Sequence, residues 1–180
     1  AERFTNLLID QLHALLAMAP VGDAHIRAIN IGGGSPDLLG PSMGRLLETL
    51  RDLPGCDDTT ELAVEFTLST TTREFIRDLI EHCVTKASFG VQSFDRTVRS
   101  ALRQPPELTH LEPVLRWIDG KIPVVNADLI TGLPGQDLQI ALRDLDVLFE
   151  EPRINAISSY VLTKGAAPSL ISALEVGKIP

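Results

Sequence analysis

Short apolar segments rich in β-branched residues alternate with longer amphipathic segments along most of the chain. The short segments have the length and composition of β-strands, and the longer ones have the apolar spacing of helices. Strands are predicted at residues 25–31, 61–66, 85–91, 122–130 and 154–162. Helices are predicted around residues 4–16, 42–53, 72–82, 108–118 and 137–150. This alternation predicts an α/β fold with a parallel sheet covered by helices.

The length of the chain restricts which parallel architecture it can form. Right-handed crossovers allow either an open sheet or part of a barrel. A complete eight-stranded barrel needs about 250 residues, more than the 180 present. We therefore expect about five strand–helix units in residues 1–163, with residues 164–180 forming a C-terminal extension. The chain has no initiator methionine, and its first helix begins almost at Ala1. We expect a longer parent chain that contains one further unit.

Composition limits the classes of partner and the compartment. The formal net charge of −8 disfavours nucleic acid and anionic membranes as main partners, because both need a positive face. No apolar run has the roughly 18 residues that a membrane helix needs, and no signal-peptide pattern precedes the first helix. Cys56 and Cys83 match no common metal motif. We expect a cytoplasmic protein, with neither a metal ligand nor a catalytic residue in this chain.

Polar side chains occur near the carboxyl ends of four predicted strands, on the face opposite the apolar residues. Asp128, for example, alternates with Ala127 and Leu129. The residues placed in this way are Asn30, Glu65, Gln92 and Asp128. The carboxyl ends of parallel strands share one rim, where ligands bind. A single polar residue at such a place can instead cap a helix or satisfy a loop amide. Four of them together predict one polar site.

The Gly32–Gly33–Gly34–Ser35 segment follows the first predicted strand. Three missing side chains allow a ligand to approach the backbone closely. The spacing differs from a dinucleotide-binding fingerprint, and no Lys-Ser or Lys-Thr pair follows as in a P-loop. The second glycine-containing segment, GLPGQ at residues 132–136, is interpreted first as a tight turn.

Five segments resemble those of the radical S-adenosylmethionine family of oxygen-independent coproporphyrinogen III oxidase and its relatives. In chain order they read INIGGGSPDLL, LAVEFTLST, ASFGVQSFD, NADLITGLPGQ and ISSYVLT. The resemblance extends from the first helix to about Thr163. It implies a partial barrel of six parallel strand–helix units, of which the first is missing here.

The resemblance also implies a cofactor site for S-adenosylmethionine. The glycine segment would hold its methionine part, an arginine would pair with the methionine carboxylate, and Ile130 would lie beside the adenine. The implied cofactor-binding residues are Gly32, Gly33, Gly34, Ser35, Glu65, Gln92, Arg103, Asp128 and Ile130.

One family feature is absent from this sequence. The family holds a [4Fe-4S] cluster with a CxxxCxxC loop, which the resemblance places before the helix that begins this chain. Cys56 and Cys83 cannot replace that loop. The cluster is therefore expected only in a complete parent chain, and the 180-residue chain alone is expected to be inactive.

The function implied for the complete parent is reductive cleavage of S-adenosylmethionine to a 5′-deoxyadenosyl radical, which acts on a tetrapyrrole or another organic substrate. A cluster-free relative that binds S-adenosylmethionine, haem or a protein is the first alternative. An unrelated barrel enzyme that binds phosphate at the glycine segment is the second. Because an incomplete barrel exposes strand edges and apolar surface at its open side, we also expect weak stability or self-association through that side unless a partner covers it.

Overall fold

A computed structural model of the chain describes residues 1–18 and 24–163. Its five strands are β1 (Ala28–Ile31), β2 (Glu61–Phe66), β3 (Lys86–Gln92), β4 (Val124–Thr131) and β5 (Ala156–Val161). Its helices are α1 (Glu2–Met18), α2 (Ser42–Arg51), α3 (Arg73–Glu81), α4 (Arg96–Ala101), α5 (Leu111–Ile118) and α6 (Leu138–Phe149), with a 3₁₀ turn η1 (Pro36–Leu39). The expected α/β fold is confirmed. The expected C-terminal extension, residues 164–180, lies outside the described residues.

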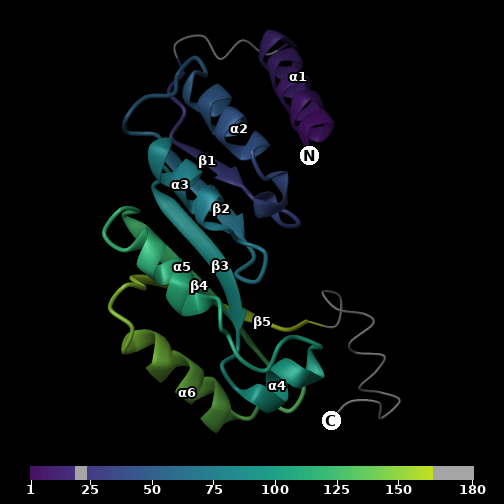
Figure 1. Ribbon diagram of the computed structural model, residues 1–180, viewed down its shortest axis with the longest axis vertical. Helices are drawn as coiled ribbons and strands as arrows, with labels where there is room; N and C mark the ends of the chain where they lie inside the picture. Colours follow the sequence, from purple (N-terminus) through teal and green to yellow (C-terminus); the bar gives the residue numbers. More distant parts are fainter. Residues whose placement is uncertain (19–23, 164–180) are drawn as a thin grey trace.

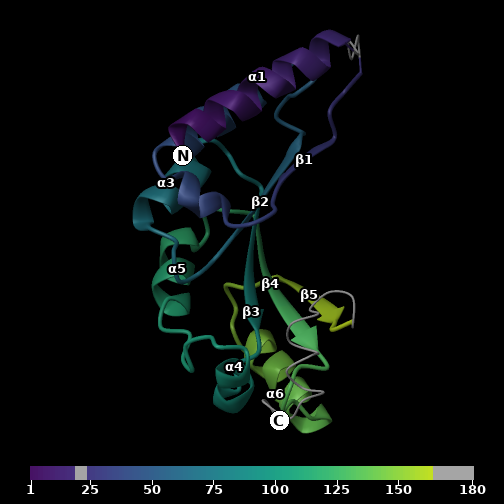
Figure 2. The ribbon, with the colours of Figure 1, turned by 90° about the vertical axis from the view of Figure 1, so that its right-hand side faces the viewer.

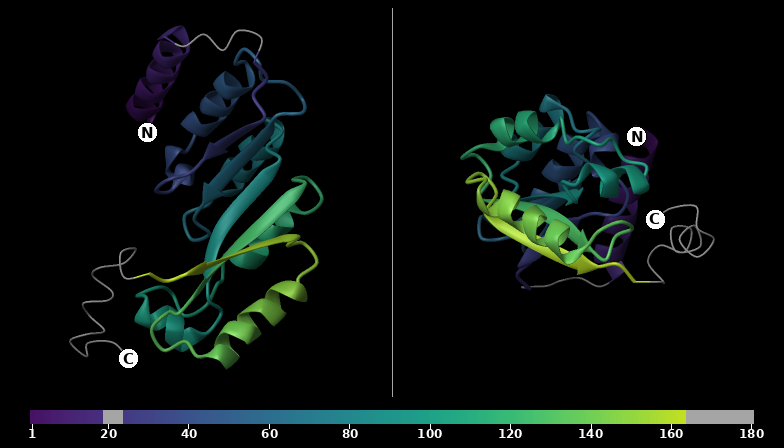
Figure 3. Two further views of the ribbon diagram at one scale, coloured as in Figure 1. Left: turned by 180° about the vertical axis from the view of Figure 1, so that it is seen from behind. Right: turned by 90° about the horizontal axis from the view of Figure 1, so that it is seen from below.

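All five strands are parallel, and each pairs with the next one along the chain, in the order β1-β2-β3-β4-β5. Figure 1 shows this sequential arrangement, with α2, α3 and α5 lying over one face of the sheet. Right-handed crossovers between sequential neighbours carry the helices to the same face of the sheet. Seen from behind, the strands lie in front of α3 and α5 and follow one another from β1 to β5 (Figure 3).

The core lies between the sheet and its helices. Leu62, Val64 and Phe66 of β2 are buried and belong to the same apolar cluster as Leu47 of α2 and Phe75 of α3. The intervening residues of β2 point to the opposite face, where both of its glutamates are exposed. This two-residue alternation leaves a polar face along the uncovered side of the sheet.

Helix α1 lies at the β1 end of the molecule, where it packs against α2. Figure 2 shows it as a long helix at the opposite end from α6. Its inward-facing Thr5 and Ile9 are buried, whereas Phe4, Leu7 and Leu15 remain more than half exposed. The predicted apolar stripe therefore forms a helix as expected, but only a minor part of it is covered by the described residues.

Two short elements were not anticipated from the sequence. The 3₁₀ turn η1 follows the glycine segment, and α4 follows β3. Each is four to six residues long, which is too short for an apolar period to be recognised. Each is the first element after a strand, so they determine how the chain leaves the rim of the sheet.

Candidate functional site

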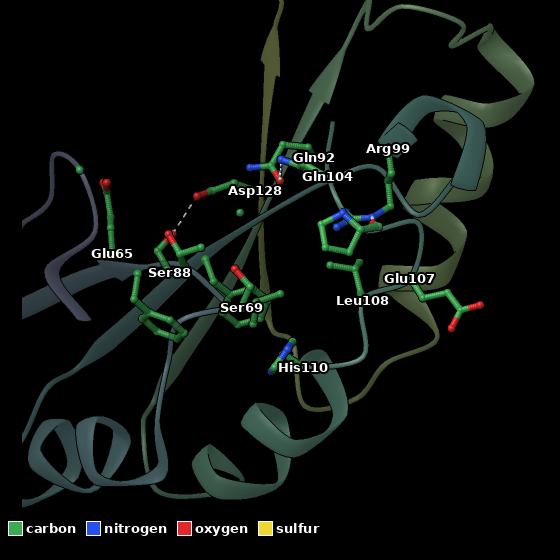
Figure 4. A pocket seen from close by; sticks show the side chains of 17 residues that line it. Glu65, Ser69, Ser88, Gln92, Arg99, Gln104, Glu107, Leu108, His110 and Asp128 are labelled. Atoms are coloured by element: carbon green, nitrogen blue, oxygen red, sulfur yellow. Dashed lines mark hydrogen bonds between the residues drawn. The ribbon is translucent and has the colours of Figure 1, made fainter. Parts of the chain in front are cut away.

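A cavity of about 360 Å³ lies at the carboxyl ends of the central strands. Its polar lining combines residues of β2, β3 and β4 with residues of the segments that follow β2 and β3. The polar and charged lining side chains are Glu65, Thr67, Ser69, Ser88, Gln92, Arg99, Gln104, Glu107, His110 and Asp128. Figure 4 shows Glu65, Ser88 and Asp128 on one side of this space, and Arg99, Glu107 and His110 across it.

Asp128 is the centre of a hydrogen-bond network across three strands. Its carboxylate accepts hydrogen bonds from Ser88 Oγ at 3.1 Å and from Asn126 Nδ2 at 2.7 Å. Asn126 Nδ2 also donates to Ser88 Oγ at 2.8 Å, and Ser158 Oγ donates to Asn126 Oδ1 at 3.1 Å. Asn126 is buried and Asp128 is half-buried. The network fixes the carboxylate in orientation while leaving part of it open to the cavity.

Glu65 lies against the glycine segment. A Cβ atom on Gly32 would be 2.7 Å from Glu65 Oε2, closer than non-bonded atoms come. The glycine segment is also attached to the loop after β2, since Ser35 Oγ lies 2.7 Å from Thr67 Oγ1 and Asp37 Oδ1 accepts from the Thr67 amide at 3.0 Å. The absence of a side chain at Gly32 therefore permits the close approach of Glu65.

Gln92 is the last residue of β3 and has a left-handed backbone, with φ of 62°. The β3–β4 register shifts between Gly90 and Gln92, which is a bulge that turns the side chain. The amide lies over Gly90, where a Cβ atom would be only 2.1 Å from Gln92 Nε2. Gln104 Nε2 donates to Gln92 Oε1 at 3.5 Å (Figure 4). The bulge thus directs Gln92 into the cavity beside Gln104.

Arg99 of α4 is 4% exposed and holds the loops next to the cavity. Its Nη1 donates to the carbonyls of Val91 at 2.8 Å and Ser93 at 3.1 Å, and its Nε donates to the Pro105 carbonyl at 2.7 Å. Burial lowers the pKa of Arg99, and the carboxylate of Asp144 opposes that effect. Arg99 therefore joins the end of β3 to the segment after α4.

Asp144 of α6 connects the loops that follow β3 and β4. This buried carboxylate accepts hydrogen bonds from Ser93 Oγ at 2.7 Å, from the Phe94 amide at 2.8 Å and from Gln136 Nε2 at 3.3 Å. Gln136 Nε2 also donates to the Ile130 carbonyl at 3.2 Å. The QSF and GLPGQ segments are thus attached to one carboxylate, which stabilises the rim beside Gln92 and Asp128.

The structure brings together part of the predicted site. Gly34, Glu65, Gln92 and Asp128 line the cavity. Four further predicted residues do not line it, namely Gly32, Gly33, Ser35 and Ile130. Of these, Gly32 and Ser35 support its wall through Glu65 and Thr67, and Ile130 follows Asp128 on the same face of β4. The exposed Asn30 does not line the cavity either.

Arg103 does not reach the cavity. It is exposed, and its φ of 57° carries the chain around a turn after α4. The next residue, Gln104, lines the cavity instead. The path of this irregular turn decides which residue faces inward, and no periodic pattern in the sequence reports it.

Sequence reasoning missed seven polar lining side chains as parts of the site, namely Thr67, Ser69, Ser88, Arg99, Gln104, Glu107 and His110. Ser88 could have been found, because its neighbours Ala87 and Phe89 face the core. Arg99 and Gln104 carry no such signal, since their positions depend on a short helix and a loop.

Both cysteines precede strands and so lie toward the opposite end of the sheet. Cys56 is half-buried ahead of β2, and Cys83 is exposed ahead of β3. Among residues 1–18 and 24–163, no three His, Cys, Asp or Glu side chains are grouped to hold a metal ion. These residues do not fit an iron–sulfur cluster that requires three thiolates.

None of the helices described is both long and apolar enough to cross a membrane.

A comparison with models of protein families finds no match. The chain is 30% identical over 163 residues to the oxygen-independent coproporphyrinogen III oxidase of Helicobacter pylori strain J99, which covers 88% of this chain and 35% of that protein. It is 27% identical over 181 residues to the anaerobilin synthase of Escherichia coli O157:H7. This match covers 97% of this chain and 40% of that protein. The chain thus spans well under half of these relatives.

Solved structures show the same fold. Coproporphyrinogen III oxidase (HemN) from Escherichia coli, described as a radical SAM enzyme, superimposes with a TM-score of 0.77 at 20% identity, over all of this chain and 42% of that one. The radical S-adenosylmethionine methyltransferase TsrM from Kitasatospora setae superimposes with a TM-score of 0.63 at 15% identity. This match covers 87% of this chain and 28% of that one. These structures show the fold, and the sequence relatives place the chain in the radical S-adenosylmethionine family of oxygen-independent coproporphyrinogen III oxidase and its relatives.

Proposed function

We propose that this chain provides the S-adenosylmethionine-binding sheet of a radical S-adenosylmethionine enzyme. The observation that supports this most strongly is the convergence of Glu65, Gln92 and Asp128, from three adjacent strands, on one cavity beside Gly34. The cavity's volume of about 360 Å³ is within the usual range for small-molecule sites.

The chemistry of these side chains suits a nucleoside that carries an amino acid. Carboxylates accept hydrogen bonds from ribose hydroxyls and from an ammonium group, and an amide can both donate and accept. Asp128 keeps acceptor capacity beyond its two internal hydrogen bonds. When bound, S-adenosylmethionine would supply the adenosyl group for radical chemistry. The residues of this chain would bind and orient it.

The cluster that the family uses has no ligands among the described residues, as the positions of Cys56 and Cys83 indicate. We therefore propose binding by this chain and catalysis only by a longer polypeptide that carries the cluster loop. This proposal is consistent with the matches to the relatives, which cover only 35% and 40% of the length of those proteins.

For the substrate of such a complete enzyme we propose a tetrapyrrole. The support comes from its relatives, which include a coproporphyrinogen III oxidase, an anaerobilin synthase and a haem chaperone. Each of these names refers to a tetrapyrrole or to its product. Catalytic residues toward that substrate are not assigned in this chain.

Calorimetric titration of the 180-residue chain with S-adenosylmethionine tests the proposal. We expect saturable binding that weakens about tenfold or more in Asp128→Asn, because a charged acceptor is lost. Asp58→Asn is the matched control, since Asp58 is exposed and lies in the loop before β2, away from the rim. Equal affinities of the wild type and Asp128→Asn, or no binding by a folded wild type, would contradict the proposal.

A further inference from the structure

The charged side chains around the cavity are mostly acidic. Glu65, Glu107 and Asp128 contribute carboxylates, whereas Arg99 contributes the one guanidinium among the described lining residues. Glu107 lies at the rim, where its Oε1 is 3.3 Å from Arg96 Nη2. Glu65 and Asp128 have no ion-pair partner in the part of the chain that the structure describes. The cavity therefore has an excess of negative charge.

Arg99 is not arranged to hold a ligand carboxylate. Bidentate binding uses two neighbouring nitrogens of the guanidinium, either Nη1 with Nη2 or Nε with Nη2. Nη1 already donates to two backbone carbonyls and Nε to a third, those of Val91, Ser93 and Pro105. Neither edge keeps two free nitrogens. Binding a carboxylate in this way would require Arg99 to release the loops that it holds.

Gln104 occupies the wall beside Gln92, where a guanidinium would be useful for a carboxylate. Its Nε2 is used toward Gln92, and its Oε1 is buried without a hydrogen-bond partner among the described residues. A buried carbonyl oxygen without a partner costs free energy unless a donor reaches it. This wall therefore offers an acceptor for a ligand donor, and it has no free guanidinium for a ligand carboxylate.

We infer that the cavity recognises adenosyl sulfonium compounds by their hydroxyl, ammonium and sulfonium groups, and that a carboxylate on the ligand contributes little to affinity. This inference rests on the proposed function and adds to it the chemical class of ligand that is preferred. Decarboxylated S-adenosylmethionine keeps every group that the acidic wall favours and lacks the carboxylate. S-adenosylhomocysteine keeps the carboxylate and lacks the sulfonium charge.

Titration of the full chain with three compounds tests the inference. Decarboxylated S-adenosylmethionine is expected to bind at least as tightly as S-adenosylmethionine, and S-adenosylhomocysteine about tenfold more weakly than S-adenosylmethionine. If S-adenosylmethionine binds but its decarboxylated form binds about tenfold or more weakly, the inference is wrong and the proposed function stands. If a folded chain binds none of the three, both are wrong.

A substitution can reverse the preference. Gln104→Arg adds a guanidinium beside Gln92 and is expected to raise the affinity for S-adenosylmethionine over the decarboxylated form by about tenfold. Gln139→Arg is the matched control, because Gln139 is exposed on α6 and the substitution adds the same charge outside the cavity. A folded Gln104→Arg variant with an unchanged ratio of the two affinities would contradict the inference.

Discussion

Two glycines allow functional side chains to lie directly against the backbone. At Gly32 the space that a Cβ atom would fill is occupied by the carboxylate of Glu65, and at Gly90 it is occupied by the amide of Gln92. Gln92 also has a positive φ, which costs a residue with a Cβ atom roughly 1 kcal/mol. The glycines therefore determine where the polar groups can be, although one of them lies outside the cavity lining.

Replacing Gly32 by alanine should weaken ligand binding through Glu65. The added Cβ atom forces the carboxylate to move, so we expect the affinity for S-adenosylmethionine to fall by about threefold to tenfold. The free energy of unfolding should change by less than about 0.5 kcal/mol, because Glu65 is exposed and can rotate away. In a Glu65→Ala background, Gly32→Ala should have no further effect on affinity. Calorimetry on the wild type, the two single variants and the double variant measures the four affinities. If the losses of affinity in the single variants add up in the double variant, the explanation is wrong.

At the scale of elements, strand and helix positions followed from the sequence. Burial of apolar side chains on one face dictates their two-residue spacing in strands and their spacing of three to four residues in helices. The residues of β2 match the predicted segment, and the other strands differ from theirs only at the ends. Glu65 and Asp128 could be predicted for the same reason, since alternation places them opposite the core. The positions of Arg103 and Gln104 could not, because backbone turns after α4 follow tertiary contacts such as the Arg99 hydrogen bond to Pro105.

The link between the β3 and β4 loops depends on a single carboxylate, Asp144 of α6. Asp144→Ala removes the acceptor to which the Ser93 hydroxyl and the Phe94 amide donate, and it removes the negative charge near Arg99. We expect a loss of about 3 kcal/mol in the free energy of unfolding. Urea denaturation measures this loss. Asp146→Ala, at an exposed position of the same helix, should change stability by less than about 0.5 kcal/mol, and similar values for the two variants would argue against the link.

Helix α5 and the turn before β5 are joined by an ion-pair network around Arg153. Its Nη2 is 2.6 Å from Glu112 Oε2, and its Nε is 2.7 Å from Glu151 Oε1. Hydrogen bonds from Arg153 lower the pKa of both glutamates below the ordinary value of 4.5. A carboxylate whose pKa is lower in the folded state stabilises the fold above the unfolded pKa.

That stabilisation should disappear as the pH falls below about 4.5. Arg153→Met removes the cause of both shifts, so its free energy of unfolding should depend less on pH than that of the wild type in this range. The difference will be modest, because the glutamates are accessible to solvent. Urea denaturation at a series of pH values checks the prediction, and parallel pH profiles of the two proteins would refute it.

At the scale of the whole molecule, the described sheet has two edge strands and an uncovered polar face. β1 and β5 each pair with one neighbour only among the described residues. Apolar side chains are exposed on α1 and at the end of β5, including Leu7 at 53%, Leu15 at 64% and Val161 at 71%. Unpaired edges and apolar surface favour association between chains.

We therefore predict that the 180-residue chain self-associates. Light scattering should give an average mass that rises with concentration, and Leu7→Glu with Leu15→Glu should reduce this rise, because both side chains are exposed on α1. The matched control is Gln11→Glu with Ala14→Glu, which adds the same charge at exposed positions of the same helix without removing a large apolar side chain. A compact monomer at every concentration would show that the prediction is wrong.

A crystal structure of the chain with S-adenosylmethionine would test the central claim most directly, namely that three strands present their polar ends to one nucleoside. We predict density for the adenosyl group in the cavity, with ligand donors within hydrogen-bond distance of Glu65 and Asp128 and with Gln92 and Gln104 on the adjoining wall. Density at another surface, or side chains of Glu65, Gln92 and Asp128 directed to separate regions of solvent, would contradict it.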